Sequence, residues 1–170
     1  MSRDLNQSFK GKIAVVTGST QGLGEAVARL FADRGLTGLV ICGRNQSKGK
    51  EVADSIHQSG CPTYYVQADL AQVEDCRNII QKADEEFGRI DCLVNCAAIT
   101  DRGTVLDTSP ELFDQMFAVN TRAPFFLMQG ALKIMIREKI KGSIVNVQSM
   151  SAHGGQPFIC LLYTSPSPRD

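Results

Sequence analysis

The sequence predicts an α/β fold, in which a doubly wound parallel sheet carries helices on both faces. Apolar runs alternate with helical patterns along the chain, giving five expected strands, and each run is almost continuously apolar. The strands of a parallel sheet are buried on both faces and therefore show continuous rather than alternating apolar residues. With 170 residues, the chain has the length of one domain with a substantial core.

Each expected strand is a short apolar run. The runs cover residues 12–17, 39–42, 63–68, 91–95 and 143–147. The helical patterns between them cover residues 22–34, 47–58, 72–87 and most of 109–138. Gly35, Gly60 and Gly88 follow the first three helices, where glycine commonly marks a helix end. Pro124 interrupts the fourth pattern, so we expect either a kink there or the first turn of a new helix after a break.

The composition of the chain argues against several classes of binding partner. Lys and Arg (18) balance Asp and Glu (18), which argues against nucleic acid or an anionic membrane as a partner. No stretch has the length of a transmembrane helix, and the first ten residues lack a signal-peptide core. None of the six cysteines has a metal-site spacing. We therefore expect no metal site, reduced thiols and a cytoplasmic location.

A glycine-rich turn, TGSTQGLG at residues 17–24, joins the first expected strand to the first helix. Gly18 allows a tight exit from the strand, Gly22 lets the backbone approach a pyrophosphate, and Gly24 lets the helix pack close to the sheet. The free N–H groups at the start of the helix would face the phosphates. A sheet-to-helix turn without a ligand is the alternative. The expected cofactor-binding residues here are Gly18, Ser19, Thr20, Gln21, Gly22, Leu23 and Gly24.

Four further motifs follow the glycine turn in chain order. They are Asp69-Leu70 after the third strand, Asn95-Cys96-Ala97-Ala98 at the end of the fourth, Asn120 in VNT, and Ser149 at the end of GSIVNVQS. With the turn pattern TGxxxGxG, this order resembles the classical short-chain dehydrogenase/reductase family from about residue 9 to about residue 159. The resemblance implies a Rossmann-type sheet with strand order 3-2-1-4-5-6 and an NAD(P)-dependent oxidoreductase.

The resemblance also implies roles for single residues. Asp69 and Leu70 would lie near the adenine, Asn95 and Ala97 at the cofactor, and Asn120 and Ser149 in the catalytic machinery. Cys96 and Ala98 depart from the family, which usually has Asn and Gly there. Each match has an ordinary alternative: Asp69 as a helix N-cap, Asn120 as a partner for backbone groups at a helix break, and Ser149 as a loop hydroxyl.

The end of the second expected strand indicates which nicotinamide cofactor is preferred. NAD-binding proteins normally have an Asp or Glu there, which binds the ribose 2′-hydroxyl. This chain has ICGRN at residues 41–45 and no carboxylate. Arg44 can instead pair with a 2′-phosphate through charge-assisted hydrogen bonds. We therefore favour NADP(H), with NAD(H) possible and a solvated surface arginine as the alternative for Arg44.

The end of the chain departs from the family pattern. The family places Tyr about thirteen residues after the serine and Lys four residues later, whereas Tyr163 lies fourteen residues after Ser149 and is followed by Ser167 at the lysine position. Residues 160–170 resemble a translated sequencing adapter, so we expect a partial catalytic domain at residues 1–159 and a non-native tail. The sheet would then be incomplete after its fifth strand, and this chain itself inactive.

Two functions remain open at this stage. The first is an oxidoreductase fragment whose parent transfers hydride between NADP(H) and a small-molecule carbonyl or alcohol, and which forms a homo-oligomer. The second is a non-catalytic dinucleotide-binding or sensor protein on the same fold. Asn120 and Ser149 favour the enzyme, because fold alone does not establish a function.

Overall fold

The computed structural model describes residues 7–101 and 103–149. Within them the five strands are β1 (Ile13–Thr17), β2 (Gly38–Gly43), β3 (Thr63–Gln67), β4 (Cys92–Asn95) and β5 (Ser143–Asn146). They form one sheet in the order β3-β2-β1-β4-β5, and every neighbouring pair is parallel. This arrangement confirms the predicted doubly wound sheet.

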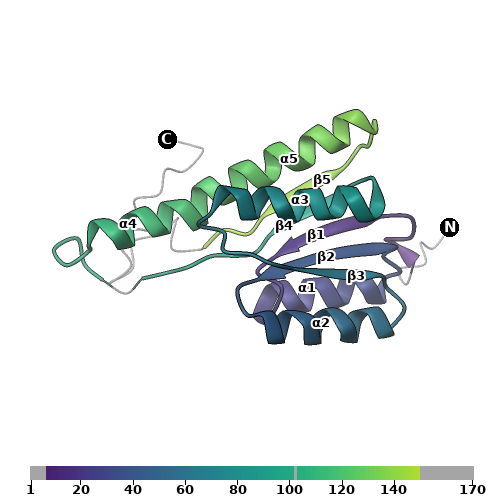
Figure 1. Cartoon of the computed structure of the whole chain (residues 1–170), viewed down its shortest axis with the longest axis horizontal. Coiled ribbons are helices and arrows are strands. Elements are labelled where there is room, and N and C mark those ends of the chain that lie inside the picture. Colours follow the sequence, from purple (N-terminus) through teal and green to yellow (C-terminus); the bar gives the residue numbers. More distant parts are fainter. Residues whose placement is uncertain (1–6, 102, 150–170) are drawn as a thin grey trace.

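Helices cover both faces of the sheet (Figure 1). α1 (Gly22–Asp33) and α2 (Gln46–Gln58) lie on one face, whereas α3 (Val73–Phe87) and α5 (Ala123–Arg137) lie on the other. The sheet has a hydrophobic core on each face, and consecutive residues of β1 point into opposite cores. Ala14 and Val16 pack toward α1 and α2, and Val15 packs toward α3 and α5. All three are fully buried, as expected for a central parallel strand.

The fourth helical pattern forms two α-helices joined by a π-helical segment. α4 (Pro110–Phe117) is followed by a π-helical segment, η2 (Ala118–Arg122), which leads directly into α5. Pro124 lies in the first turn of α5, directly after η2, so its missing N–H falls where the helical hydrogen-bond pattern changes. Phe117, Arg122 and Ala123 all keep helical backbone angles, so Pro124 follows a change of helix type and not the expected break. π-helical segments often occur at functional sites, and this one contains Asn120.

β5 is the least buried strand. In the described part of the chain it pairs only with β4, and its Val145 is 48% exposed; Val147, just after the strand, is 43% exposed. This exposure is expected because β5 is an edge strand of the described sheet. No helix in residues 7–101 and 103–149 combines the length and apolar character needed to cross a bilayer.

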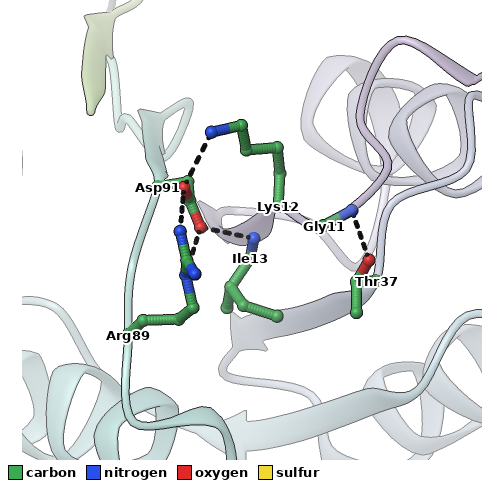
Figure 2. A network of polar contacts seen from close by, with 6 residues as sticks. All are labelled: Gly11, Lys12, Ile13, Thr37, Arg89 and Asp91. Carbon is green, nitrogen blue, oxygen red and sulfur yellow. Dashed lines mark hydrogen bonds and ion pairs between the residues drawn. The ribbon is translucent and has the colours of Figure 1, made fainter. Parts of the chain in front are cut away.

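A buried carboxylate joins the amino ends of β1 and β4, at the edge of the sheet opposite the glycine turn (Figure 2). Asp91 Oδ2 accepts hydrogen bonds from the Ile13 N–H at 3.0 Å and from Arg89 Nε at 2.9 Å. Its Oδ1 accepts from Lys12 Nζ at 3.1 Å and from Arg89 Nη2 at 2.7 Å. The Asp91 side chain is only 3% exposed, so these donors replace the water that it loses.

Asp91→Ala should lower the free energy of unfolding at pH 7 by about 2–3 kcal/mol, because the Ile13 N–H is left without its acceptor. Burial raises the pKa of Asp91, but Arg89, the Ile13 N–H and Lys12 outweigh burial and hold this pKa below its ordinary range. The contribution of Asp91 is therefore complete above pH 4 and is lost as the pH falls through the lower folded pKa. Urea unfolding between pH 2 and pH 7 measures this difference.

The matched control is Asp54→Ala, which removes an exposed carboxylate from α2. A stability loss for Asp91→Ala that is no larger than that of the control, or that persists unchanged at pH 2, would contradict the assigned role of Asp91.

Candidate cofactor site

A cleft of about 290 Å³ lies at the carboxyl ends of the strands. Ligands of open parallel sheets bind in this position, where the chain turns to opposite faces from neighbouring strands. Here β1 leads to α1 on one face, and β4 leads toward α4 and α5 on the other. The turns after β1 to β4 and the region of α4 and η2 line the cleft with Gly18, Thr20, Gln21, Gly22, Leu23, Gly24, Cys42, Gly43, Arg44, Ala68, Asp69, Leu70, Cys96, Ala97, Ala98, Ile99, Gln115 and Val119.

Glycine occupies these three positions of the turn for different structural reasons. Gly18 has φ +62°, and a Cβ on it would lie 2.8 Å from the Ala97 Cα. Gly24 lies in α1, and a Cβ there would contact the Gly18 carbonyl oxygen and lie 3.0 Å from the Thr17 oxygen. Gly22 has φ +59°, but a Cβ on it would meet no atom within 4 Å. Gly18 and Gly24 therefore allow close packing, whereas open space lies at Gly22.

The amino end of α1 faces this open space without a capping side chain. Its N-cap residue is Gln21, and the Gln21 side chain makes no capping hydrogen bond. By contrast, Asn45 caps α2 by accepting a hydrogen bond from the Lys48 N–H at 3.0 Å. The first N–H groups of a helix need acceptors, and a phosphate group supplies them. The residues present at the turn therefore fit the pyrophosphate of a dinucleotide.

Ser19 stabilises the turn and does not line the cleft. It is completely buried, and its hydroxyl donates to the Val16 carbonyl at 2.6 Å and accepts from the Cys42 N–H at 3.1 Å. The Ser19 N–H donates to the Cys42 carbonyl at 3.2 Å. Because both polar groups are used inside the protein, the expectation that Ser19 binds the cofactor finds no support in this geometry.

Arg44 follows β2 at the rim of the cleft, and its side chain is exposed. Gln67 Nε2 donates to the Arg44 carbonyl at 3.3 Å, which ties the backbone of this turn to β3. Thr20, from the glycine turn, contacts the neighbouring Gly43, where a Cβ would lie 2.7 Å from Thr20 Cγ2. The backbone at Gly43 and Arg44 is thus held, while Arg44 itself is exposed and borders the cleft.

Asp69 and Leu70 border the cleft after β3. Asp69 Oδ1 accepts from the Ala71 N–H at 3.0 Å, and the Asp69 N–H donates to Asp75 Oδ2 at 2.7 Å. The N-cap residue of α3 is Gln72, so the alternative of Asp69 as the N-cap is wrong. Asp69 instead shapes the turn that precedes the helix, with its side chain exposed.

The turn after β4 is held from two sides. Thr17 Oγ1 accepts hydrogen bonds from the N–H groups of Cys96 and Ala97, both at 3.2 Å. Asn95 is buried and does not line the cleft; its Nδ2 donates to Asn146 Oδ1 at 2.8 Å and so links β4 to β5. Asn95 Oδ1 has no hydrogen-bond partner in the described part of the chain. Asn95 therefore acts on the strands rather than at the cleft.

The cleft contains two thiols, neither of which is activated. Burial raises the pKa of Cys42 to about 12, and burial also raises the pKa of Cys96. Both thiols are therefore neutral at pH 7, and a neutral thiol is a poor nucleophile. The five cysteines of the described residues are all free.

Asn120 lies in η2 and clamps the backbone after β4. Its Oδ1 accepts from the Ile99 N–H at 3.0 Å, and its Nδ2 donates to the Ile99 carbonyl at 2.9 Å. Ile99 lines the cleft, so the π-helical segment fixes one wall of it. Asn120 thus satisfies backbone groups, but those of the loop after β4 and not those of its own helix, as the alternative had it.

Ser149 lies three residues beyond the end of β5 and is exposed. The Val147 N–H donates to the Asn95 carbonyl at 3.0 Å, so the segment leading to Ser149 still follows β4. Ser149 thus lies at the carboxyl edge of the sheet, as predicted, although neither Ser149 nor Asn120 lines the cleft itself. Tyr163 and the segment from residue 160 lie outside the described residues.

Sequence reasoning missed several cleft residues. Gln115 and Val119 belong to α4 and η2, and they reach the cleft only because the chain returns across it after β4. Ile99 also was not predicted, although it directly follows the Asn95–Ala98 motif. Only this adjacency could have indicated Ile99, because an apolar wall residue has no chemical signature of its own.

The sheet and the cleft define an α/β protein with a phosphate-binding type of turn. A family model described as short chain dehydrogenase matches residues 12–165. The chain belongs to this oxidoreductase family. The match continues beyond residue 159, into the segment expected to be a non-native tail; the tail, its boundary and its resemblance to an adapter stay predictions.

Curated relatives agree with this assignment. An uncharacterized oxidoreductase of Thermotoga maritima is 37% identical over 158 residues, which are 93% of this chain and 61% of the relative. An L-rhamnose 1-dehydrogenase (NADP(+)) of Thermoplasma acidophilum is 33% identical over 150 residues, which are 88% of this chain and 59% of the relative. The chain therefore spans about 60% of the length of these relatives.

Solved structures give the same fold. A putative betaketoacyl-ACP reductase has a TM-score of 0.81 at 34% identity, covering 91% of this chain and 61% of that one. A metagenomic short-chain oxidoreductase in complex with NADP has a TM-score of 0.84 at 28% identity, covering 92% of this chain and 70% of that one.

Proposed function

We propose that this chain is the NADP(H)-binding part of an oxidoreductase that transfers hydride between NADP(H) and a small-molecule carbonyl or alcohol. This proposal rests mainly on the amino end of α1, which has no capping side chain. It follows the glycine turn and faces the cleft at the carboxyl ends of the strands. The family membership and the NADP named for one relative and for one solved neighbour support it.

Each part of the cleft suits one part of the cofactor. The turn from Gly18 to Gly24 would hold the pyrophosphate, and Asp69 and Leu70 would border the adenine. Arg44 would pair with the 2′-phosphate, and Ala97 would lie beside the ribose and nicotinamide end. When bound, the cofactor supplies or accepts hydride at the nicotinamide C4 atom.

Two residues of the chain would serve the reaction itself. Ser149 would donate a hydrogen bond to the substrate oxygen as charge develops on it. Asn120 would act as a positioning residue, because both the oxygen and the nitrogen of its side-chain amide already bond Ile99. The proton donor, by family resemblance a tyrosine assisted by a lysine, would come from sequence beyond the described residues.

The surface and the thiols support two further parts of the proposal. α4 and α5 expose Phe113 (43%), Phe125 (56%) and Ile136 (75%), and such apolar exposure suits a homo-oligomer. Free cysteines with pKa values raised by burial suit a reducing, cytoplasmic compartment.

Arg44→Ala should weaken NADPH binding by about ten-fold or more and leave NADH binding nearly unchanged, because only NADPH carries the 2′-phosphate that pairs with the guanidinium group. Fluorescence titration of the 170-residue chain with each cofactor measures both affinities. Lys133→Ala, which removes an exposed cation from α5, serves as the control for net charge.

An unchanged NADPH affinity in Arg44→Ala, or tighter binding of NADH than of NADPH by the parent, would contradict the preference for NADP(H).

A further inference from the structure

Arg44 lies on a very short connection between β2 and α2. The strand ends at Gly43, and Asn45 is the N-cap residue of the helix, so Arg44 alone separates the two. Because the connection is this short, the position of the Arg44 backbone depends on what holds its two flanks. One flank is the Gly43 carbonyl group, and the other is the first turns of α2.

The Tyr65 hydroxyl, from β3, holds the strand flank. It donates a hydrogen bond to the Gly43 carbonyl at 2.7 Å. Burial raises the pKa of Tyr65, so the hydroxyl stays protonated and donates at neutral pH. The same carbonyl also accepts from the Ala68 N–H at 3.1 Å. The Tyr65 hydroxyl is therefore a second contact on this carbonyl, and removing it leaves the Gly43 oxygen with a partner.

The ring of the same side chain holds the helix flank. A Cβ at Gly49, in the first half of α2, would overlap the Tyr65 ring, so the ring lies directly against the helix backbone. Tyr65 also packs on the hydrophobic core to which α2 contributes Val52, Ala53 and Ile56. One side chain of β3 thus contacts both flanks of the connection that carries Arg44.

We propose that Tyr65 is a positioning residue for recognition of the NADP(H) 2′-phosphate, acting through Arg44. This inference rests on the proposed function, in which Arg44 pairs with that phosphate. A group that is ordered only on binding lowers the affinity, whereas a backbone already held at both flanks has less freedom to lose. Because NADH lacks the 2′-phosphate, Tyr65 should affect the binding of NADPH and not that of NADH.

Tyr65→Phe keeps the ring against α2 and removes only the hydroxyl. We expect NADPH binding by the 170-residue chain to weaken about three- to ten-fold, the effect of one lost hydrogen bond, while NADH binding stays nearly unchanged. Fluorescence titration with each cofactor measures both affinities. Circular dichroism should show a folded variant, because the Gly43 carbonyl keeps the Ala68 N–H as its donor.

Tyr64→Phe is the matched control. Tyr64 is the preceding residue of β3, but it packs on the core of the opposite face, where its ring meets the Phe87 ring edge-on at 5.6 Å between centroids. The same hydroxyl is thus removed from the same strand without touching the Arg44 connection. This variant should bind NADPH and NADH like the parent.

The double variant with Arg44→Ala tests whether Tyr65 acts through Arg44. Once the guanidinium group is gone, Tyr65→Phe should cause no further loss of NADPH affinity, because the two residues belong to one interaction. A general structural role would instead lower the affinity by the same factor in both backgrounds.

The inference is overturned if Tyr65→Phe leaves NADPH affinity unchanged or weakens NADH binding as much as NADPH binding. It is equally overturned if Tyr64→Phe has the same effect, or if Tyr65→Phe costs as much affinity in the Arg44→Ala background as in the parent. Failure of the proposed cofactor preference gives a different result: the parent itself then binds NADH at least as tightly as NADPH, and the role of Tyr65 falls with that preference.

Discussion

Ser149→Ala should lower kcat by about 10²–10³-fold in a full-length, active form of the enzyme, while NADPH affinity stays close to that of the parent. The serine would donate its hydrogen bond to the substrate oxygen mainly when charge develops there, so its loss acts on the transition state more than on the cofactor. Steady-state kinetics of carbonyl reduction, together with NADPH titration, separate the two effects.

Ser143→Ala is the matched control for this prediction. Ser143 begins the same strand, β5, at the opposite edge of the sheet from Ser149. It should therefore keep parental kcat. If Ser149→Ala also keeps parental kcat, or if Ser151→Ala is the variant that loses activity, the assignment of the catalytic serine is wrong.

Gly24→Ala should cost about 2–3 kcal/mol of stability and weaken NADPH binding by about ten-fold or more. The new Cβ would contact the Gly18 carbonyl oxygen and lie 2.8 Å from the Gly18 carbonyl carbon, both backbone atoms of the glycine turn. To relieve this contact, α1 must move away from the turn, and its amino end would no longer meet the phosphates. Urea unfolding and NADPH titration measure the two losses.

Gly130→Ala provides the control for tight helix packing. Gly130 lies in α5, and a Cβ there would lie 3.0 Å from the Ile80 side chain, away from the cleft. This substitution should change stability without changing NADPH affinity. Equal affinity losses for Gly24→Ala and Gly130→Ala would show that the glycine turn has no special role in binding.

Local patterns were sufficient to predict the sheet. The runs at residues 12–17 and 91–95 differ from β1 and β4 by one residue, Lys12 or Asp91, at the amino end. Continuous apolar residues report burial on both faces, and glycines report helix ends, so each signal lies within the element that it predicts. Pro124 similarly indicated a change in the fourth helical pattern. The sequence holds no comparable signal that this change is a π-helical segment.

Contacts between distant residues were less accessible to sequence reasoning. Gly24 packs closely on the turn as expected, but the packing of Gly18 against Ala97 joins the turns that follow two different strands, β1 and β4. Ser19 stands in the middle of the binding motif, yet its hydroxyl serves Val16 and Cys42. A hydroxyl in a turn can face the ligand or the core, and only the position of β2 beside β1 decides between them.

Titration of the 170-residue chain with NADPH, followed by nicotinamide fluorescence, tests the central claim most directly. We predict saturable binding of one NADPH per chain, competed by NADP⁺ and strongly weakened in Gly24→Ala. A chain that is folded by circular dichroism but shows no saturable NADPH or NADH binding would contradict the assignment of the cleft as a dinucleotide site.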